Sequence, residues 1–304
     1  MKVGGCAIHL PYFNSKKLPA LVKKIFSVTA LLCLLLSSRA YCGWPTRPGR
    51  LIFSPSISYF TSNKDWDSLA RKRVKENNGT FTSTSVNLYA EYGIVRKLAA
   101  YASLPYISYR LRDSINAPIS KSGLGDAELG LKYYLANINY KYYFTLQGTA
   151  VIPMYKTQGL GYAQPGGELR LGFSGAGKIG SKFYSLSLEN GVRKYFGNNG
   201  PLQDRYSASF GITLDKKFHD QLTAGVSGIV STSSFTAFTR NIFTARDYEF
   251  TQVSLSYGHT FNSSFSMFLT ASQFVVGRNT GIGTNGALAL IYKIDNFLGK
   301  RVDY

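Results

Sequence analysis

Acidic and basic side chains recur at every second position in several short segments of the chain. Glu168 and Arg170 are two positions apart, and Glu189 and Arg193 follow in the next such segment. Alternate residues of a β-strand share one face, so these groups could pair across neighbouring strands. A turn centred near residues 179–180 would place Arg170 roughly opposite Glu189, and Glu168 diagonal to Arg193. The charged residues expected on this face are Asp126, Glu128, Lys132, Glu168, Arg170, Glu189, Arg193 and Arg205.

Two uses of this charged face remain open from the sequence. The charges could neutralise one another and close the interior that the face encloses. They could instead form a constriction that screens small solutes by charge, as rings of charged side chains do in pores. In either case the extracellular half of that interior is expected to contain Asp126, Glu128, Arg193 and Arg205.

Catalytic chemistry has little support in these residues. Beyond the first 42 residues the chain has two histidines, His219 and His259, and both fall in predicted short turns. The glycine-containing triplets 159–161 and 281–283 resemble fragments of phosphate-binding loops, but neither opens a predicted helix. All cysteines lie near the N-terminus, at Cys6, Cys33 and Cys42. We therefore expect no catalytic residue, no cofactor and no metal site.

The segment from 124 to 152 shows which elements carry the charges. Between residues 127 and 135 every odd position is apolar or aromatic, and the charged residues occupy even positions. After a turn at 136–139 the parity changes, and the even positions from 140 to 152 carry the apolar side chains. A period of two residues is typical of β-strands, whereas a helix would need a period of 3.6. The segment is therefore predicted to be a β-hairpin with one apolar face.

Runs of the same kind continue to the C-terminus and give about twelve strands. We place them near 50–60, 80–92, 98–111, 124–135, 140–152, 167–176, 183–195, 205–214, 221–231, 247–258, 265–276 and 284–295. Most have about ten to thirteen residues, enough to cross a bilayer when tilted. The sequence thus predicts an all-β fold, a transmembrane antiparallel up-and-down β-barrel of about 12 strands.

The connections between these strands alternate in length. Short turns are expected near 93–97, 136–139, 177–182, 215–220 and 259–264, and longer loops near 61–79, 112–123, 153–166, 196–204 and 232–246. Bacterial outer-membrane barrels have short periplasmic turns and longer extracellular loops. An even strand number then places both termini in the periplasm.

The direction of each strand face follows from the cost of charge in lipid. A charged side chain on the lipid face costs up to about 2–4 kcal/mol near the bilayer midplane. Turning the strand 124–135 over would expose Asp126, Glu128 and Lys132 to acyl chains. The residues expected to meet lipid are Leu129, Leu131, Phe144, Leu146, Leu169, Leu171, Phe173, Leu186, Leu188, Phe210 and Ile212.

The strand at 98–111 is harder to interpret than the others. Pro105 has no backbone N–H to donate, which predicts a bulge or a strand end at this position. Beyond it, Arg110 and Arg112 could belong either to the strand or to the loop that follows.

The N-terminal 42 residues have the layout of a secretory signal peptide. Lys23 and Lys24 precede an apolar run at 25–36, and small and polar residues follow. About a dozen apolar residues are fewer than the roughly 20 that a spanning helix needs. We therefore expect a signal peptide at 1–42 and a single barrel domain at 43–304.

The chain carries a formal charge of +19, of which six leader bases account for +6 and leave +13 for the remainder. These bases are spread along the chain and form no known nucleic-acid-binding module, so no nucleic-acid partner is expected. The most polar stretch is 61–79, where five basic residues surround Trp66, and we expect a solvated loop there. Residues 43–49 are expected either at the periplasmic mouth, with Trp44 at the interface, or without fixed structure.

Three segments resemble a known family. Residues 92–98 (Tyr-Gly-Ile-Val-Arg-Lys-Leu), 103–106 (Ser-Leu-Pro-Tyr) and 123–133 (Gly-Leu-Gly-Asp-Ala-Glu-Leu-Gly-Leu-Lys-Tyr) are similar to the repeated pattern of the MetA-pathway phenol-degradation family of outer-membrane barrels. The resemblance is clearest over 80–175. It implies a bacterial outer-membrane protein that admits small, often hydrophobic molecules, and it supplies no catalytic residues.

We therefore predict an outer-membrane barrel that acts as a narrow pore or facilitator for small solutes, hydrophobic or aromatic ones among them. Twelve strands fall between the filled eight-stranded barrels and the open sixteen-stranded porins. The expected partners are outer-membrane lipid, lipopolysaccharide and small solutes, with the oligomeric state left open. A non-conducting barrel whose basic loops bind lipopolysaccharide or a surface partner is the first alternative. A lipid-modifying enzyme and a soluble secreted barrel are weaker ones.

Overall fold

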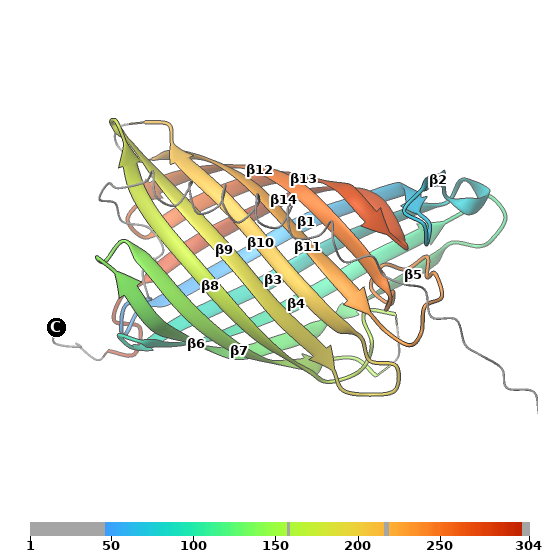
Figure 1. Ribbon diagram of the computed structural model, residues 1–304, viewed down its shortest axis with the longest axis horizontal. Helices are drawn as coiled ribbons and strands as arrows, with labels where there is room; N and C mark the ends of the chain where they lie inside the picture. The colour runs from blue at the N-terminus through green and yellow to red at the C-terminus, as the bar shows by residue number, and fades with distance from the viewer. Residues whose placement is uncertain (1–45, 157–158, 216–218, 300–304) are drawn as a thin grey trace, which may run out of the picture. The chain divides into compact units, whose positions relative to one another are not determined.

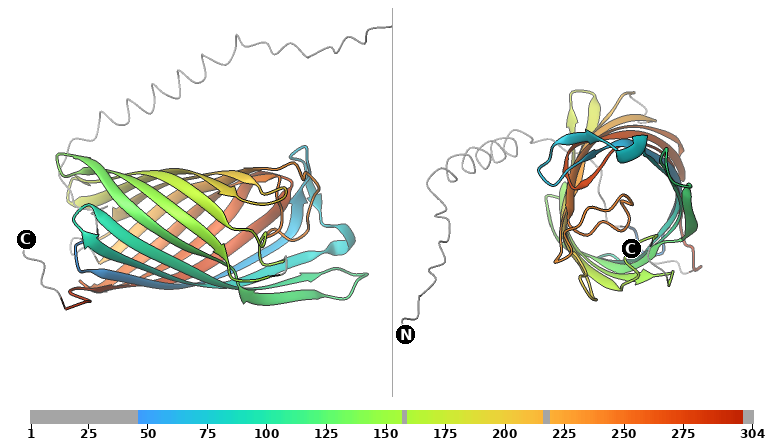
Figure 2. Two further views of the ribbon diagram at one scale, coloured as in Figure 1. Left: turned by 90° about the horizontal axis from the view of Figure 1, so that it is seen from below. Right: turned by 90° about the vertical axis from the view of Figure 1, so that its right-hand side faces the viewer.

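The computed structural model describes residues 46–156, 159–215 and 219–299. The predicted signal peptide at 1–42 lies outside these ranges, as does Trp44. Within them, twelve long antiparallel strands form a closed barrel whose strands are steeply tilted (Figures 1 and 2). These strands are β1 (Leu51–Trp66), β3 (Thr80–Val95), β4 (Leu98–Arg112), β6 (Asp126–Ile138), β7 (Tyr142–Pro153), β8 (Gly166–Ile179), β9 (Lys182–Tyr195), β10 (Leu202–Thr213), β11 (Asp220–Thr232), β12 (Tyr248–Asn262), β13 (Phe265–Arg278) and β14 (Thr280–Ile294).

The barrel closes because β14 pairs with β1. Their register runs from Leu51 opposite Ile294 to Trp66 opposite Thr280, so the first and last long strands leave no free edge between them. An ion pair of 2.5 Å between Arg50 and Asp295 joins the chain just before β1 to the chain just after β14. A closed barrel satisfies all backbone donors and acceptors of its wall, which is the condition for a sheet to cross lipid.

Each predicted strand is present, and the prediction of a twelve-stranded barrel is confirmed. Two short strands, β2 (Lys72–Val74) and β5 (Ile119–Leu124), extend the sheet at the end that carries the long loops, next to a single 3-10 turn, η1 (Glu76–Asn78). The connection between β13 and β14 is shorter than the predicted strand ends imply, since Asn279 alone separates them. Asn279 adopts a left-handed backbone conformation (φ 56°), which lets this one residue reverse the chain.

Pro105 lies inside β4 and ends neither the strand nor its pairing with β3, where it faces Asn87. The predicted irregularity lies instead on the other edge of β4, where its partner strand changes. β6 pairs with β4 only as far as Ser103, and β5 pairs from Tyr106 onward. The Pro105 carbonyl accepts a bond of 2.8 Å from the N–H of Gly125, the residue between β5 and β6. Arg110 and Arg112, which the sequence left between strand and loop, belong to β4.

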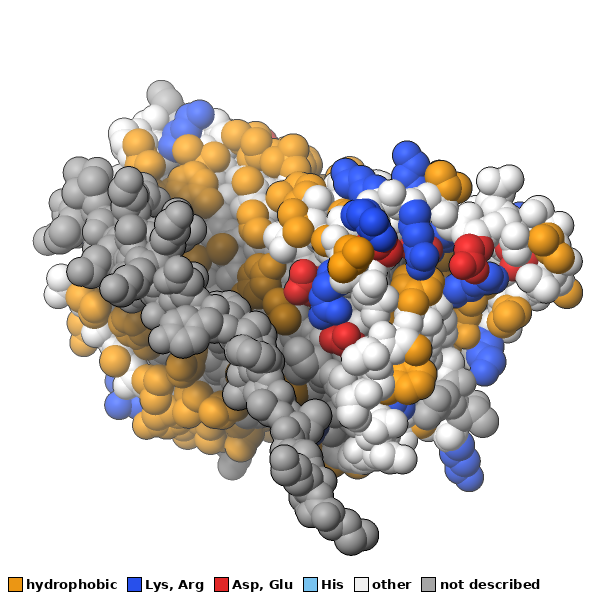
Figure 3. Space-filling model, turned by 45° about the vertical axis from the view of Figure 1, so that its right-hand side comes forward, with side chains coloured by type: hydrophobic (Ala, Val, Ile, Leu, Met, Phe, Trp, Pro, Cys, Tyr) orange, Lys and Arg blue, Asp and Glu red, His pale blue; other side chains and the backbone are white. Residues whose placement is uncertain are grey.

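The outer wall is apolar, as the alternation predicted. Seven of the eleven residues expected to meet lipid are more than a third exposed, and they are Leu129, Leu131, Phe144, Leu169, Leu171, Leu188 and Phe210. The remaining four, Leu146, Phe173, Leu186 and Ile212, are half-buried. Figure 3 shows apolar side chains over much of the barrel wall, with Lys and Arg side chains gathered toward the end with the long loops. Among the described residues, no helix combines the length and the apolar content needed to cross a membrane.

The long loops meet at one end, which by the rule for bacterial barrels is the extracellular one. The longest of them, residues 233–247 between β11 and β12, folds into the barrel mouth rather than away from it (Figure 2, right). Tyr162, in the loop between β7 and β8, donates a hydrogen bond of 2.6 Å to the carbonyl of Ala245 in loop 233–247. A segment of the chain itself therefore occupies part of the extracellular mouth.

Candidate functional site

A network of carboxylates and guanidinium groups crosses the inner face of β6 to β10. Its centre is Glu168, whose side chain is fully buried. Arg193 of β9 binds Glu168 of β8 at 2.5 Å and reaches past β8 and β7 to Glu128 of β6, also at 2.5 Å. Arg170 donates to the other Glu168 oxygen at 2.5 Å and to Glu189 at 3.0 Å. The network therefore lies inside the lumen, on one side and in the half nearer the long loops.

The pairing register between β8 and β9 differs from the expected one, because the turn that joins them is centred one residue later in the sequence. The turn between β8 and β9 consists of Gly180 and Ser181, so Glu168 lies directly opposite Arg193. Arg170 faces Gly191 and reaches Glu189 diagonally. Gly180 has φ 60°, which suits the first central position of a two-residue hairpin turn. Both expected ion pairs form, with the direct and diagonal positions exchanged.

The remaining predicted charges lie around this centre. Asp126 accepts hydrogen bonds from Tyr155 at 2.7 Å and from Tyr195 at 3.3 Å. Arg205 on β10 approaches Glu168 only to 3.9 Å. Lys132 is nearer the periplasmic end and pairs with Glu91 of β3 at 2.6 Å. Glu91 was not among the residues singled out from the sequence, although its parity on β3 matches the inward positions.

The periplasmic mouth holds the segment 46–49. Thr46 donates a hydrogen bond to Glu91, and the Gly49 N–H donates to the Gly93 carbonyl at 2.8 Å. A side chain on Gly93 would meet the Arg47 carbonyl at 2.2 Å, so glycine is required where the segment passes β3. Of the two expectations for this region, the position at the mouth holds for the described residues.

The opposite side of the lumen is aromatic, which the sequence analysis missed. A chain of neighbouring rings crosses the inner face from β4 to β12, made of Tyr109, Phe81, Phe60, Phe274, Phe250 and Tyr248. We call these six residues the aromatic band. The ring of Phe60 lies across β14, where a side chain on Gly283 would meet it at 1.9 Å. Phe250 and Phe274 stack with centroids 4.2 Å apart.

The signal that could have revealed the band is parity. Phe81, for example, shares its face of β3 with Ser83, which is also buried. Aromatic residues at positions of polar parity point inward, so the strand assignments already contained this information.

The inward loop 233–247 packs on both sides of the lumen. Phe243 lies 5.9 Å from Phe81 and 5.9 Å from Tyr109, so the loop contacts the aromatic band. The Asn241 side chain donates a hydrogen bond of 2.7 Å to the carbonyl of Gly159, in the loop between β7 and β8. Arg246 donates to the carbonyls of Asn198 and Asn199. These bonds hold the loop across the mouth from several directions.

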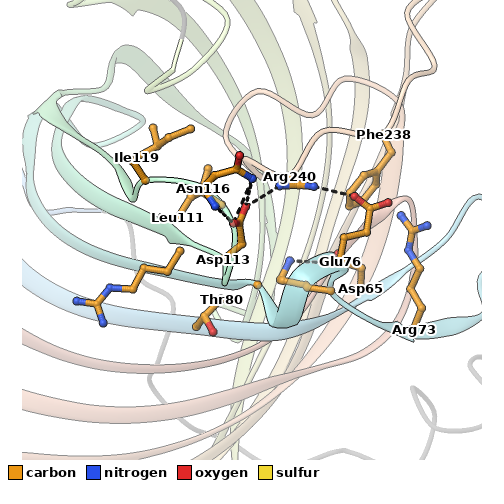
Figure 4. A pocket seen from close by; sticks show the side chains of 14 residues that line it. Asp65, Arg73, Glu76, Thr80, Leu111, Asp113, Asn116, Ile119, Phe238 and Arg240 are labelled. Carbon is orange, nitrogen blue, oxygen red and sulfur yellow. Dashed lines mark hydrogen bonds and ion pairs between the residues drawn. The ribbon is translucent and has the colours of Figure 1, made fainter.

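An exposed ion bridge fastens the tip of the same loop. Arg240 binds Glu76 at 2.7 Å and Asp113 at 3.1 Å, in a pocket between three extracellular loops (Figure 4). Arg240 lowers the pKa of Glu76. The side-chain and backbone N–H groups of Asn116 lower the pKa of Asp113 to about 2. Both carboxylates therefore stay ionised down to acidic pH, and the bridge persists with them.

The predicted solvated loop at 61–79 is exposed only in part. Arg71 and Lys72 are exposed, whereas Trp66 is buried inside the mouth and Lys75 is buried with Asp65 as its partner. The polar sequence hid these contacts because Asp65 and Lys75 lie ten residues apart and pair only when the loop turns back.

The histidines meet at the short-turn end of the barrel. His259 lies 2.7 Å from Asp220, and its ring is 6.2 Å from that of His219. This His and Asp pair lies at the periplasmic end, away from the extracellular rim where a lipid-modifying enzyme of the outer leaflet would act. Among the described residues, no cluster of three or more His, Cys, Asp and Glu side chains could hold a metal ion.

Comparison with known proteins adds information on the fold. No protein-family model matches the chain, and no curated protein does. Among solved structures, the COG4313 outer membrane channel from Pseudomonas putida F1 is similar with a TM-score of 0.68 and 13% identity, over 84% of this chain and all of that one. At this identity the likeness shows the fold, and membership of the MetA-pathway family stays a prediction.

Two further structures are more distant. The translocator domain of the autotransporter NalP from Neisseria meningitidis has a TM-score of 0.46 and 10% identity, over 90% of this chain and 95% of that one. The NanC porin has a TM-score of 0.46 and 7% identity, over 78% of this chain and all of that one. With its closed wall, its apolar exterior and the architecture it shares with the Pseudomonas channel, this chain has the fold of an outer-membrane β-barrel.

Proposed function

We propose that this barrel is a narrow pore or facilitator for small solutes, with loop 233–247 as its extracellular cover. The single observation that carries the proposal is the two-sided lumen beneath that loop. One wall is charged around Glu168, and the facing wall is the aromatic band. A barrel that served only as an anchor would gain nothing from this inner surface.

Small and partly apolar solutes suit such a lumen better than large hydrophilic ones. Interiors of porins are generally polar and water-filled. Here rings from five strands line one side, and the Glu168 network fills part of the other. The proposed solutes are therefore small molecules with an apolar or aromatic portion, in agreement with what the family resemblance implies.

Single-channel recording in planar bilayers tests the pore. We expect small current steps from the refolded protein, and larger steps when residues 234–244 are replaced by a Gly-Gly linker. The matched control replaces the turn 139–141 between β6 and β7, at the opposite end of the barrel, by Gly-Gly, which should leave the step size unchanged. The absence of current from both the intact protein and the loop-deleted variant, each shown to be folded, would reject the pore.

The alternative of a non-conducting barrel has one observation in its favour. Arg71 and Lys72 are exposed between β1 and β3, and Figure 3 shows Lys and Arg side chains gathered toward the end of the barrel with the long loops. Anionic lipopolysaccharide would suit such a surface. Two results together would favour this function. The refolded protein would bind lipopolysaccharide vesicles more tightly than its Arg71→Gln/Lys72→Gln variant, and neither the intact protein nor the loop-deleted variant would give current.

A further inference from the structure

A cavity of about 310 Å³ lies where the charged network meets the aromatic band. Arg170, Glu189 and Arg205 line one end, and Ile229 and Phe250 line the other. Its volume is at the lower end of the range for small-molecule sites, about 300–1,000 Å³. The cavity therefore has room for a small molecule with a polar end and an apolar end.

The polar end offers a guanidinium whose donors are largely unused. Arg205 has one carboxylate neighbour, Glu168 at 3.9 Å, and makes no hydrogen bond within the described part of the chain. That Glu168 oxygen is already bound by Arg193 at 2.5 Å. Glu189 also lines the cavity, but Arg170 binds it at 3.0 Å. Arg205 is thus the group in this cavity best able to accept a new anionic partner.

The apolar end lies at a fixed distance from this cation. Arg205 pairs with Ile229, and Ile229 pairs with Phe250, so the three residues form one row across β10, β11 and β12. Neighbouring strands are about 4.8 Å apart, which places Phe250 roughly 10 Å along the wall from Arg205. Phe250 is held in place by its stack on Phe274, and its side chain also lines the cavity.

We propose that this cavity binds an organic carboxylate with a flat apolar body, an inference that rests on the proposed pore. The carboxylate accepts hydrogen bonds from Arg205, and the body packs on Ile229 and Phe250. Arg is suited to this role because its planar fork binds both oxygens of a carboxylate. Ser207, Ser227 and Gln252 line the cavity between the two ends. A neutral aromatic molecule would leave Arg205 unpaired, and a small anion such as acetate would leave the apolar wall in water.

Titration calorimetry on the refolded protein in detergent tests the site with benzoate as the probe. We expect benzoate to bind more tightly than benzyl alcohol or acetate, and Arg205→Gln to weaken it by about 10-fold to 100-fold, the value of a charge-assisted hydrogen bond. Arg205→Lys should bind with intermediate affinity because it keeps the charge and loses the fork. Phe250→Ala should weaken benzoate but not acetate.

The matched control is Arg110→Gln, which removes an exposed arginine of β4 outside the lumen and should leave benzoate affinity unchanged. Each variant is first shown to be folded by its heat-modifiable migration in gels. Equal benzoate affinity in the intact protein and Arg205→Gln, or equal affinity for benzoate and benzyl alcohol, would overturn the site.

Calorimetry also separates this site from the pore, because it does not require conduction. Arg205-dependent binding without any current would leave the site standing and reject the pore. Current without Arg205-dependent binding would do the reverse.

Discussion

The buried position of Glu168 makes it the most sensitive residue of the inner network. In Glu168→Gln, Arg193 keeps only Glu128, Arg170 keeps only Glu189, and Arg205 loses its nearest carboxylate. Removing one partner of a buried ion pair generally costs about 3–5 kcal/mol, because the other charge stays buried without compensation. We expect a loss of that size in the free energy of unfolding of Glu168→Gln.

Glu189→Gln is the matched control for this prediction. It makes the same chemical change in the same network, but its side chain is 40% exposed and has Arg170 as its single ion-pair partner in the described structure. Pairs of this exposure contribute about 0–1 kcal/mol. The difference between the two variants should therefore exceed about 2 kcal/mol.

The assay is equilibrium urea unfolding in lipid vesicles, followed by tryptophan fluorescence. The chain has two tryptophans. A Trp44→Phe background leaves Trp66, which is 3% exposed, as the single reporter. The double variant Glu168→Gln/Arg193→Met should recover part of the loss because it removes the stranded charge. Equal losses for Glu168→Gln and Glu189→Gln, or no recovery in the double variant, would refute the reasoning.

Three further predictions concern the two mouths of the barrel. Because the pKa of Asp113 is lowered to about 2 and that of Glu76 is also lowered, the Arg240 bridge contributes its stability above pH 4.5 and loses it as pH falls through the lowered pKa values. The current-step size should thus be constant from pH 8 to pH 5 and increase only below about pH 4, and a change between pH 8 and pH 5 would contradict this. Phe243→Ala removes the contact of loop 233–247 with the aromatic band, so we expect more frequent openings in single-channel records, whereas Phe235→Ala, an exposed residue of the same loop, should leave them unchanged. Gly93→Ala would place a side chain 2.2 Å from the Arg47 carbonyl, so the segment 46–49 should be displaced and become cleavable by the unspecific protease proteinase K in the folded barrel; resistance equal to that of the unchanged protein would contradict it.

The strands could be predicted from the sequence because their physics is local. Alternation along each strand identifies the two faces, and the cost of charge in lipid decides which face is outward. Glu128 and Leu129 are an example, since no other orientation of β6 keeps the carboxylate out of lipid. The same rule assigned every strand from β6 to β10.

The contents of the lumen were harder to predict because they depend on long-range contacts. Tyr162 binds Ala245 across 83 residues, and no local pattern in loop 233–247 indicates that it turns inward. The register between β8 and β9 differs from the predicted one because the two turn residues are Gly180 and Ser181, whereas the prediction centred the turn on Ile179 and Gly180. Pro105 predicts a bulge or a strand end because it lacks an N–H, but the sequence does not indicate which neighbouring strand accommodates it.

The most direct test of the account is whether a solute-accessible path runs beside Arg205. The described barrel has no cysteine, so Ser207→Cys introduces one on the lumen side, next to the proposed cavity. Ala208→Cys is its control, since Ala208 pairs with Leu188 and Val226 on the lipid face. A charged, membrane-impermeant thiol reagent should reduce the current through Ser207→Cys and leave Ala208→Cys unchanged. Modification of Ala208→Cys alone, or unaltered current in a Ser207→Cys barrel that has demonstrably reacted, would contradict the account.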